Sequence, residues 1–160
     1  MPQVHPIAPV FAPDSRVLIL GSFPSVLSRE TCFYYAHARN RFWRVLSAVL
    51  AEPLPDTVEE KRTLLLRHRI ALWDVIASCE IDGSDDAIIR AVVPNDLCVI
   101  TSCAQIERVF TNGGTADRLY RKHCLVQTGI PAQRLPSTSP ANAGCSLNQL
   151  VAAWRAILAE

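Results

Sequence analysis

The chain has 160 residues, 49% of them hydrophobic, and a formal net charge of +1. This length predicts one domain over residues 1–160, with residues 1–14 as an N-terminal extension, and the small net charge excludes a protein that binds nucleic acid by its overall charge. No apolar run approaches the roughly 18–20 residues that span a bilayer and no signal peptide is recognisable, so we expect a cytoplasmic protein without membrane contact. Separately, we expect a monomer.

Apolar runs alternate with amphipathic segments from the start of the domain. Residues 16–21 form a short apolar run that ends in glycine, which is typical of a buried parallel strand. Residues 22–25 follow as a loop, because Pro24 cannot continue a strand ladder. Apolar residues then recur at helical spacing over residues 42–50 and predict a helix that starts near Asn40.

The middle of the chain predicts a helix, a strand and a second helix. A helix is expected over residues 57–68, with Asp56 as its N-cap because an acidic residue lies three positions later. Residues 70–73 are apolar and predict a second buried strand, followed by a polar loop over residues 74–78. A serine at the start of residues 84–91 predicts the cap of a further helix over that range.

One segment of the second half is ambiguous. In residues 97–101 the β-branched side chains favour a strand, whereas the preceding turn-and-cap sequence favours a helix. We expect a helix, because residues 106–111 make a better strand, which closes at the Asn-Gly-Gly sequence of residues 112–114. The chain then continues as a helix, a short strand and a final amphipathic helix over residues 115–123, 133–135 and 147–158.

Strands that alternate with helices predict an α/β fold, here a three-layer α/β/α sandwich around a short, mostly parallel four-stranded sheet. In such a sheet, ligands bind beyond the carboxyl ends of the strands. The candidate binding loops therefore follow the strands, over residues 22–25, 74–78, 112–114 and 137–142. Four polar loops at one edge are typical of an active cleft but do not identify its chemistry.

A local cluster combines basic and aromatic side chains. The cluster consists of three arginines, one histidine and five aromatic residues, namely Arg39, Arg41, Arg44, His37, Phe33, Tyr34, Tyr35, Phe42 and Trp43. Base stacking and phosphate contacts use this combination, which therefore indicates a nucleotide-handling surface. The alternative is a helix whose arginines face solvent.

Cysteines do not indicate a disulfide framework or a metal site. Six of them lie in apolar or mixed segments, without a C-x-x-C pair or zinc-site spacing, as reduced intracellular thiols do. A cysteine hydrolase using Cys32 or Cys145 with His37 is a competing class of enzyme, but no nucleophile-elbow motif supports it.

An ordered set of motifs resembles one known family. The motifs are GSFPS at residues 21–25, YYAHARNRFW at 34–43, LWDVI at 72–76, VFTNG at 109–113 and LPSTSPAN at 135–142. Together they resemble the hypoxanthine-DNA (deoxyinosine) glycosylase family of the uracil-DNA glycosylase superfamily, over most of the chain from residue 17 to the last helix. Ala38 departs from the pattern, because a proline is expected there.

The resemblance implies a monofunctional base-excision repair enzyme. It would hydrolyse the N-glycosidic bond of hypoxanthine, with uracil or xanthine as further candidates, in DNA that contains deaminated bases, and its chemistry requires no metal or organic cofactor. The target base must leave the duplex, stack on a side chain and be read along its edge. Phe23 is the expected stacking platform and Ser22 a base contact; the alternative for Phe23 is a core residue after a strand.

Asn40 is the expected water-positioning residue. The transition state resembles an oxocarbenium ion, so the enzyme must orient a water molecule and stabilise the departing base. The loop over residues 22–25 has no carboxylate or amide, and the resemblance assigns the role to Asn40. An amide is a weak base, but it can orient water when the sugar is already cationic. Capping of the next helix is the alternative role, and the two roles can coexist.

Two residues after strands are candidates for reading the base. Superfamily relatives place such a residue at the position of Asp74, where a carboxylate would accept the N1–H of hypoxanthine or the N3–H of uracil. Alternatively, Asp74 caps a short helical turn. Asn112 is expected to bond the base or sugar, or to form an Asx-turn before the two glycines.

The resemblance also assigns a DNA-binding loop, in which Ser137, Thr138 and Ser139 contact phosphates and Asn142 continues as a wedge. His37, Arg39 and Arg41 complete the expected DNA contacts. A histidine that relatives carry at the start of this loop is replaced here by a Leu-Pro pair. Its absence favours hypoxanthine, or a broader range of deaminated bases, over strict uracil specificity. A uracil-preferring glycosylase and a non-catalytic module that binds damaged DNA remain alternatives.

Overall fold

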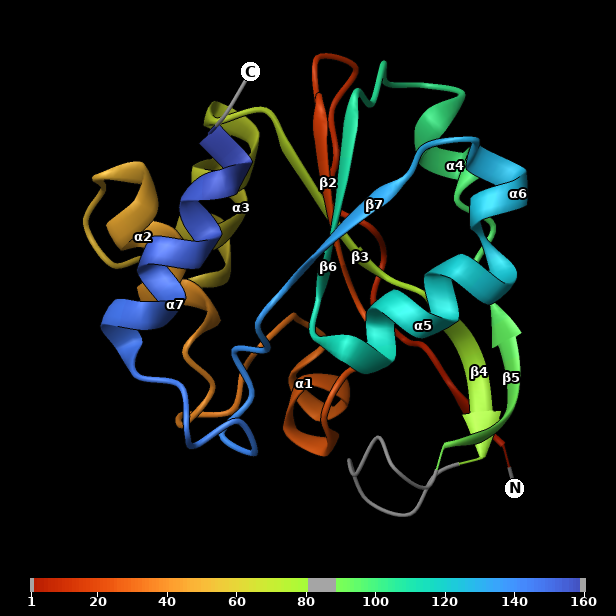
Figure 1. Cartoon of the computed structure of the whole chain (residues 1–160), viewed down its shortest axis with the longest axis horizontal. Helices are drawn as coiled ribbons and strands as arrows, with labels where there is room; N and C mark the ends of the chain where they lie inside the picture. Colours follow the sequence, from red (N-terminus) through yellow and green to blue (C-terminus); the bar gives the residue numbers. More distant parts are fainter. Residues whose placement is uncertain (1, 81–88, 159–160) are drawn as a thin grey trace.

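The middle layer of the computed structural model, which describes residues 2–80 and 89–158, is a parallel sheet (Figure 1). Its four strands follow the order β3-β2-β6-β7, and every pairing is parallel. They are β2 (Val17–Gly21), β3 (Ile70–Asp74), β6 (Arg108–Asn112) and β7 (Ala132–Leu135). The predicted fold class and the four predicted strands are confirmed.

Helices cover both faces of this sheet (Figure 1). One side carries α2 (Phe42–Leu50), α3 (Val58–Arg67) and α7 (Leu147–Trp154), which continues as a 3-10 turn over Arg155–Leu158. The other side carries α4 (Cys98–Thr101), α5 (Gly114–His123) and α6 (Leu125–Thr128). The helices predicted at these places are confirmed, including the ambiguous α4, whereas α6 was not expected.

The N-cap of α3 is one residue later than expected. Thr57, not Asp56, caps the helix, and its hydroxyl accepts the Glu60 N–H at 3.1 Å. The cap and its acidic partner are still three positions apart, because Glu60 takes the place expected for Glu59.

A second sheet lies beside the first and was not expected. Its three strands pair antiparallel in the order β1-β4-β5. They are β1 (Gln3–Val4), β4 (Ile76–Glu80) and β5 (Arg90–Pro94).

A further unexpected element is the short helix α1 (Val26–Thr31). It follows Ser25, whose side chain caps it, and it lies at the end of the parallel sheet where β6 leads into α5 (Figure 1).

This second sheet corrects two predictions. The loop expected over residues 74–78 is wrong, because β4 begins at Ile76. The helix expected over residues 84–91 is wrong at residues 90 and 91, which open β5, while residues 84–88 lie outside the described part of the chain. In both cases strands from distant parts of the chain pair with the segment, and this pairing outweighs the local pattern.

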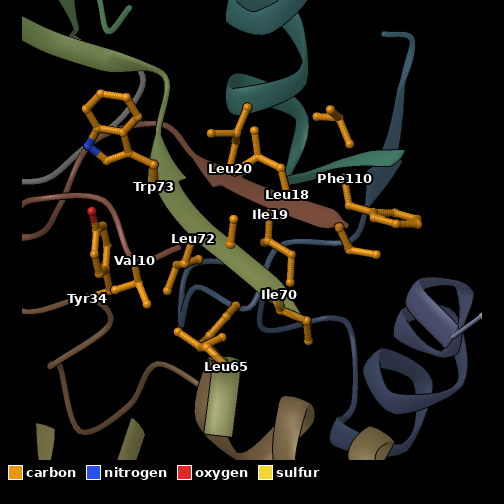
Figure 2. Packing of buried hydrophobic residues seen from close by; sticks show 14 of the residues in the cluster. Val10, Leu18, Ile19, Leu20, Tyr34, Leu65, Ile70, Leu72, Trp73 and Phe110 are labelled. Atoms are coloured by element: carbon orange, nitrogen blue, oxygen red, sulfur yellow. The ribbon is translucent and has the colours of Figure 1, made fainter. Parts of the chain in front are cut away.

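The N-terminal segment belongs to the packed fold. Val10 pairs with Leu72 through two backbone hydrogen bonds of 2.9 Å, and Ile7 and Val10 are buried. Figure 2 shows Val10 and Leu72 in one apolar cluster with Tyr34 and Leu65. The segment therefore runs along the outer edge of β3 and approaches the carboxyl ends of the parallel strands.

The core lies on both faces of the parallel sheet. Every residue of β2 and β3 is buried, as expected for strands that are covered by other elements on both sides.

Among residues 2–80 and 89–158, no helix is long and apolar enough to cross a membrane. All six cysteines are free thiols.

Candidate active site

A pocket of about 190 Å³ lies at the carboxyl ends of β2, β3 and β6. Loops from distant parts of the chain meet there, as the topology of a parallel sheet predicts. The pocket is lined by nine of the predicted site residues: Ser22, Phe23, His37, Asn40, Asp74, Asn112, Ser137, Thr138 and Ser139. The other three, Arg39, Arg41 and Asn142, do not line it.

A chain of hydrogen bonds joins Asn40 to Asn112 through Thr138. The Asn112 amide group donates through Nδ2 to Thr138 Oγ1 at 3.0 Å, and this hydroxyl donates to Asn40 Oδ1 at 2.9 Å. Thr138 is fully buried, so its side chain serves this chain of bonds and does not reach the surface. Three of the predicted residues thus form one unit.

Backbone amides at both ends determine the direction of these bonds. Thr138 N–H donates to Asn112 Oδ1 at 3.0 Å, so Asn112 must turn its Nδ2 toward the threonine hydroxyl. Phe42 N–H donates to Asn40 Oδ1 at 2.9 Å, so this oxygen accepts from two donors. Among the residues that the structure describes, Asn40 Nδ2 has no hydrogen-bond partner, and it is therefore the group that Asn40 can offer to a ligand.

The capping role considered for Asn40 is present. Its side chain accepts a hydrogen bond from the second residue after it, at the start of α2, whereas the cap residue Arg41 makes no such bond. Asn40 N–H in turn donates to the His37 carbonyl at 2.9 Å. The turn over residues 37–40 therefore forms with Ala38 at the position where a proline was expected.

Asn112 has little hydrogen-bonding capacity left for a base. Its two Nδ2 hydrogens point at Thr138 Oγ1 and at the Tyr35 hydroxyl, 3.2 Å away. Its oxygen already accepts the Thr138 N–H. An Asx-turn, the alternative role, is not among these bonds.

Asp74 is paired with a histidine that sequence reasoning missed. His5 Nε2 lies 2.8 Å from Asp74 Oδ2, and the two side chains are only 3% and 4% exposed. Because β4 follows Asp74 after one residue, the alternative in which Asp74 caps a helical turn is wrong. No local signal links residue 5 to residue 74; the pairing of β1 with β4 and of Val10 with Leu72 brings them together.

The other carboxylate oxygen of Asp74 lies over Gly21. A Cβ atom added to Gly21 would lie 2.4 Å from Asp74 Oδ1 and 2.8 Å from the Tyr35 hydroxyl. Both distances are shorter than real contacts of a Cβ atom, so only glycine permits this close approach. Gly21 therefore has a steric role at the floor of the pocket.

Phe23 is half-buried at the pocket. The edge of the His5 ring meets it at a centroid distance of 5.9 Å, and the Arg29 guanidinium lies 5.4 Å from its centroid. Ser22 beside it is buried, and its carbonyl accepts the Ile76 N–H at 3.1 Å. The ring is thus held between the N-terminal segment and α1, while part of it faces the pocket.

The basic and aromatic cluster is divided between the core and the pocket. Phe33, Phe42 and Trp43 are 3%, 0% and 6% exposed, so the predicted nucleotide-handling surface is wrong for these three. Phe42 and Trp43 are buried because the apolar face of α2 packs into the core, and the Phe33 ring stacks on Trp43 at a centroid distance of 6.1 Å. Tyr34 and Tyr35 do line the pocket. Burial raises the pKa of the Tyr34 hydroxyl, which donates to the Ala8 carbonyl at 2.9 Å and stays neutral.

The loop after β7 is tied to the start of α2. Arg41 N–H donates to the Thr138 carbonyl at 3.0 Å, and its guanidinium donates to the carbonyls of Cys145 and of Asn142, the latter at 3.0 Å. Asn142 Nδ2 donates to the Ser137 carbonyl at 3.0 Å. Arg39, by contrast, is exposed, and its side chain has no partner among the described residues.

Three comparisons with known proteins agree. Residues 8–158 match the family model of the uracil DNA glycosylase superfamily. Two hypoxanthine DNA glycosylases are similar, each at 33% identity: one of Methanosarcina acetivorans, over 90% of both chains, and one of Methanosarcina barkeri, over 66% of this chain and 68% of the relative. A solution NMR structure of a candidate uracil DNA glycosylase from Methanosarcina acetivorans superposes with a TM-score of 0.79, at 30% identity, over 99% of this chain and 100% of that one.

Proposed function

Because the chain belongs to the uracil DNA glycosylase superfamily, we propose that it hydrolyses the N-glycosidic bond of deaminated bases in DNA, with hypoxanthine as the preferred base. The single observation that carries the choice of deaminated over parent bases is a buried carboxylate, Asp74, in a pocket that also holds an aromatic ring and an oriented amide. The names of the two curated relatives support the same substrate.

The carboxylate of Asp74 suits the chemical change that deamination causes. Adenine presents a lone pair at N1, whereas hypoxanthine presents N1–H; cytosine and uracil differ in the same way at N3. An ionised carboxylate only accepts hydrogen bonds, so it matches the deaminated base and repels the parent base. Phe23 would stack on the flipped base, as enzymes that extrude a base require.

Asn40 would place the attacking water. As the C1′–N9 bond breaks, its electron pair leaves with hypoxanthine, and the sugar becomes an oxocarbenium-like cation that water attacks at C1′. Water needs positioning more than deprotonation at this stage. The Nδ2 group of Asn40 is suited to it, since its Oδ1 is held by Phe42 N–H and Thr138. The attacking water gives up one proton to the solvent and the departing hypoxanthine anion takes one up, so water is the only co-reactant of this hydrolysis.

The remaining expected residues divide into two roles. We propose that Arg39, His37, Ser137 and Ser139 contact the DNA backbone, because they are exposed or half-buried around the pocket. Arg41 and Asn142 instead order the loop through the bonds described above. A wedge role for Asn142, base contacts by Ser22 and Asn112, a monomeric state and a cytoplasmic location stay predictions.

The test is excision from a labelled duplex that contains one deoxyinosine, followed by alkali, which breaks the strand at an abasic site. We expect cleavage, with slower cleavage of deoxyuridine and deoxyxanthosine substrates. Recovery of full-length strands at saturating enzyme would contradict the proposal and favour a non-catalytic binding module.

The role of Asn40 has its own test. We expect Asn40→Ala to lower single-turnover excision by about 100-fold or more, the scale of losing a positioned polar group at a transition state, while binding of the duplex changes little. Because Asn40 also caps α2, the variant should lose about 1 kcal/mol of stability. Asn40→Asp keeps the capping oxygen and serves as the stability control. An unchanged excision rate in Asn40→Ala would remove Asn40 from the mechanism.

A further inference from the structure

His5 stands at the boundary between the N-terminal segment and the pocket. Its backbone N–H donates to the Ala77 carbonyl at 2.7 Å, which continues the pairing of β1 with β4. Its ring is thereby placed below the pocket, with Nε2 at 2.8 Å from Asp74 Oδ2. Both side chains are almost completely buried, so water does not compete for this bond.

The tautomer of His5 follows from a backbone donor. Ile7 N–H donates to His5 Nδ1 at 3.2 Å, so Nδ1 must carry a lone pair. The proton of the neutral ring is then on Nε2 and points at Asp74. A doubly protonated ring would place Nδ1–H against Ile7 N–H. The surroundings therefore favour a neutral histidine that donates to a carboxylate.

This bond determines what Asp74 presents to the pocket. With Oδ2 engaged by His5, the other oxygen lies over Gly21, 2.4 Å from the place that a Cβ atom would take. The His5 ring also meets the edge of Phe23, at a centroid distance of 5.9 Å. One side chain thus contacts both the proposed base-reading carboxylate and the proposed stacking ring.

We propose that His5 is a positioning residue that determines base specificity. By donating Nε2–H to Oδ2, it fixes the orientation of the Asp74 carboxylate, so that Oδ1 faces the N1–H of hypoxanthine. Loss of this donor lets the carboxylate rotate, so that Oδ1 no longer faces the edge of the base that distinguishes hypoxanthine from adenine. The inference rests on the proposed function, which assigns the base to this pocket.

The test measures kcat/KM for excision of hypoxanthine in the full-length chain. We expect His5→Phe, which keeps a ring but removes the donor, to lower kcat/KM by about 10- to 100-fold, the scale of leaving one buried polar group unpaired. His5→Gln supplies a neutral N–H at a similar place, and we expect it to recover kcat/KM to within about threefold of wild type, a deficit smaller than one hydrogen bond is worth.

A double-mutant cycle shows whether His5 acts through Asp74. Asp74→Asn keeps an oxygen for His5 and turns an N–H toward the base, where it opposes N1–H, so hypoxanthine excision should fall. We expect His5→Phe to cause no further loss in the Asp74→Asn background. The control is His68→Phe, which removes the 2.8 Å bond between His68 and Glu52, a histidine–carboxylate pair outside the pocket lining, and should leave kcat/KM unchanged.

Each outcome bears on a separate claim. If wild type excises no deaminated base, the proposed function fails and this inference with it. If wild type is active but His5→Phe keeps full kcat/KM, or if the losses in the cycle are additive, only the role of His5 is overturned. If His5→Phe does not fold, the imidazole ¹⁵N spectrum of the wild type provides the test. The His5 signals are assigned as those that disappear in His5→Gln. A proton on Nδ1 of His5 in this spectrum would contradict the proposal.

Discussion

At the scale of single residues, the hydroxyl of Thr138 joins two amide side chains in one polar unit. We expect Thr138→Val, which keeps the shape but removes the hydroxyl, to lower excision by about 10-fold or more, because a buried donor and a buried acceptor then lose their partner. Thr138→Ser keeps the hydroxyl and is the matched control.

Single-turnover rates and thermal unfolding separate an effect of these variants on excision from an effect on the stability of the fold. A Thr138→Val chain that unfolds at a lower temperature but excises hypoxanthine at the wild-type rate would show that the hydroxyl supports only the fold. Salt dependence of DNA binding should be unchanged in both variants, because the side chain is fully buried.

The residues of the site could be predicted better than their contacts. Motif resemblance led to nine residues that do line the pocket. The network among Asn40, Thr138 and Asn112 was not foreseen, since a sequence shows which side chains follow strands but not which ones meet. His5 was missed for the same reason: its partner lies 69 positions away.

At the scale of elements, the loop after β7 depends on one arginine at the start of α2. Arg41 bonds this loop through its backbone and its guanidinium, whereas Arg39 is exposed. We expect Arg39→Ala to reduce the slope of log Kobs against log salt for DNA binding by about one, as loss of a phosphate contact does. Arg41→Ala should instead leave the slope unchanged and lower the excision rate.

Binding titrations at several salt concentrations check this pair of variants. A reduced slope in Arg41→Ala would mean that its guanidinium leaves the two carbonyls and contacts a phosphate when DNA binds. An unchanged slope in Arg39→Ala would exclude Arg39 from the DNA contacts.

The elements that could be predicted share one property: their apolar pattern is local. The continuous apolar runs of β2 and β3 and the helical spacing of α2 identify them without any partner. β4 and β5 mix small, polar and charged residues, and they form because each pairs with a strand from elsewhere. α1 is short, and its cap follows a proline that indicated only a loop.

At the scale of the whole molecule, buried acids make the fold sensitive to alkali. Burial raises the pKa of the Cys124 thiol from 9.0 to about 11, and it also raises the pKa of the Tyr34 and Tyr120 hydroxyls. At pH values between the ordinary pKa of these groups in the unfolded chain and their higher pKa in the folded chain, the unfolded chain binds fewer protons than the folded chain. The free energy of unfolding therefore falls as pH rises above about 9.

Urea unfolding at about pH 8 and about pH 10.5 measures this change, and the midpoint should be lower at the higher pH. Cys124→Ala removes one of the three groups and should reduce the difference between the two midpoints. A midpoint that does not change with pH would mean that these groups ionise equally in the folded and unfolded chains.

The way in which β1 is attached to the fold has a consequence for the accuracy with which a base is selected. This strand has two residues and joins the fold through two register pairs with β4, whereas the parallel sheet beneath the pocket is buried on both faces. Short edge segments open in local fluctuations long before a core sheet does, and amide exchange reports the difference. Each such opening would withdraw His5 from Asp74 while Asn40 and Thr138 keep their places. Fidelity in choosing a base would then depend on the local stability of one short strand, and bond cleavage on the global stability of the domain.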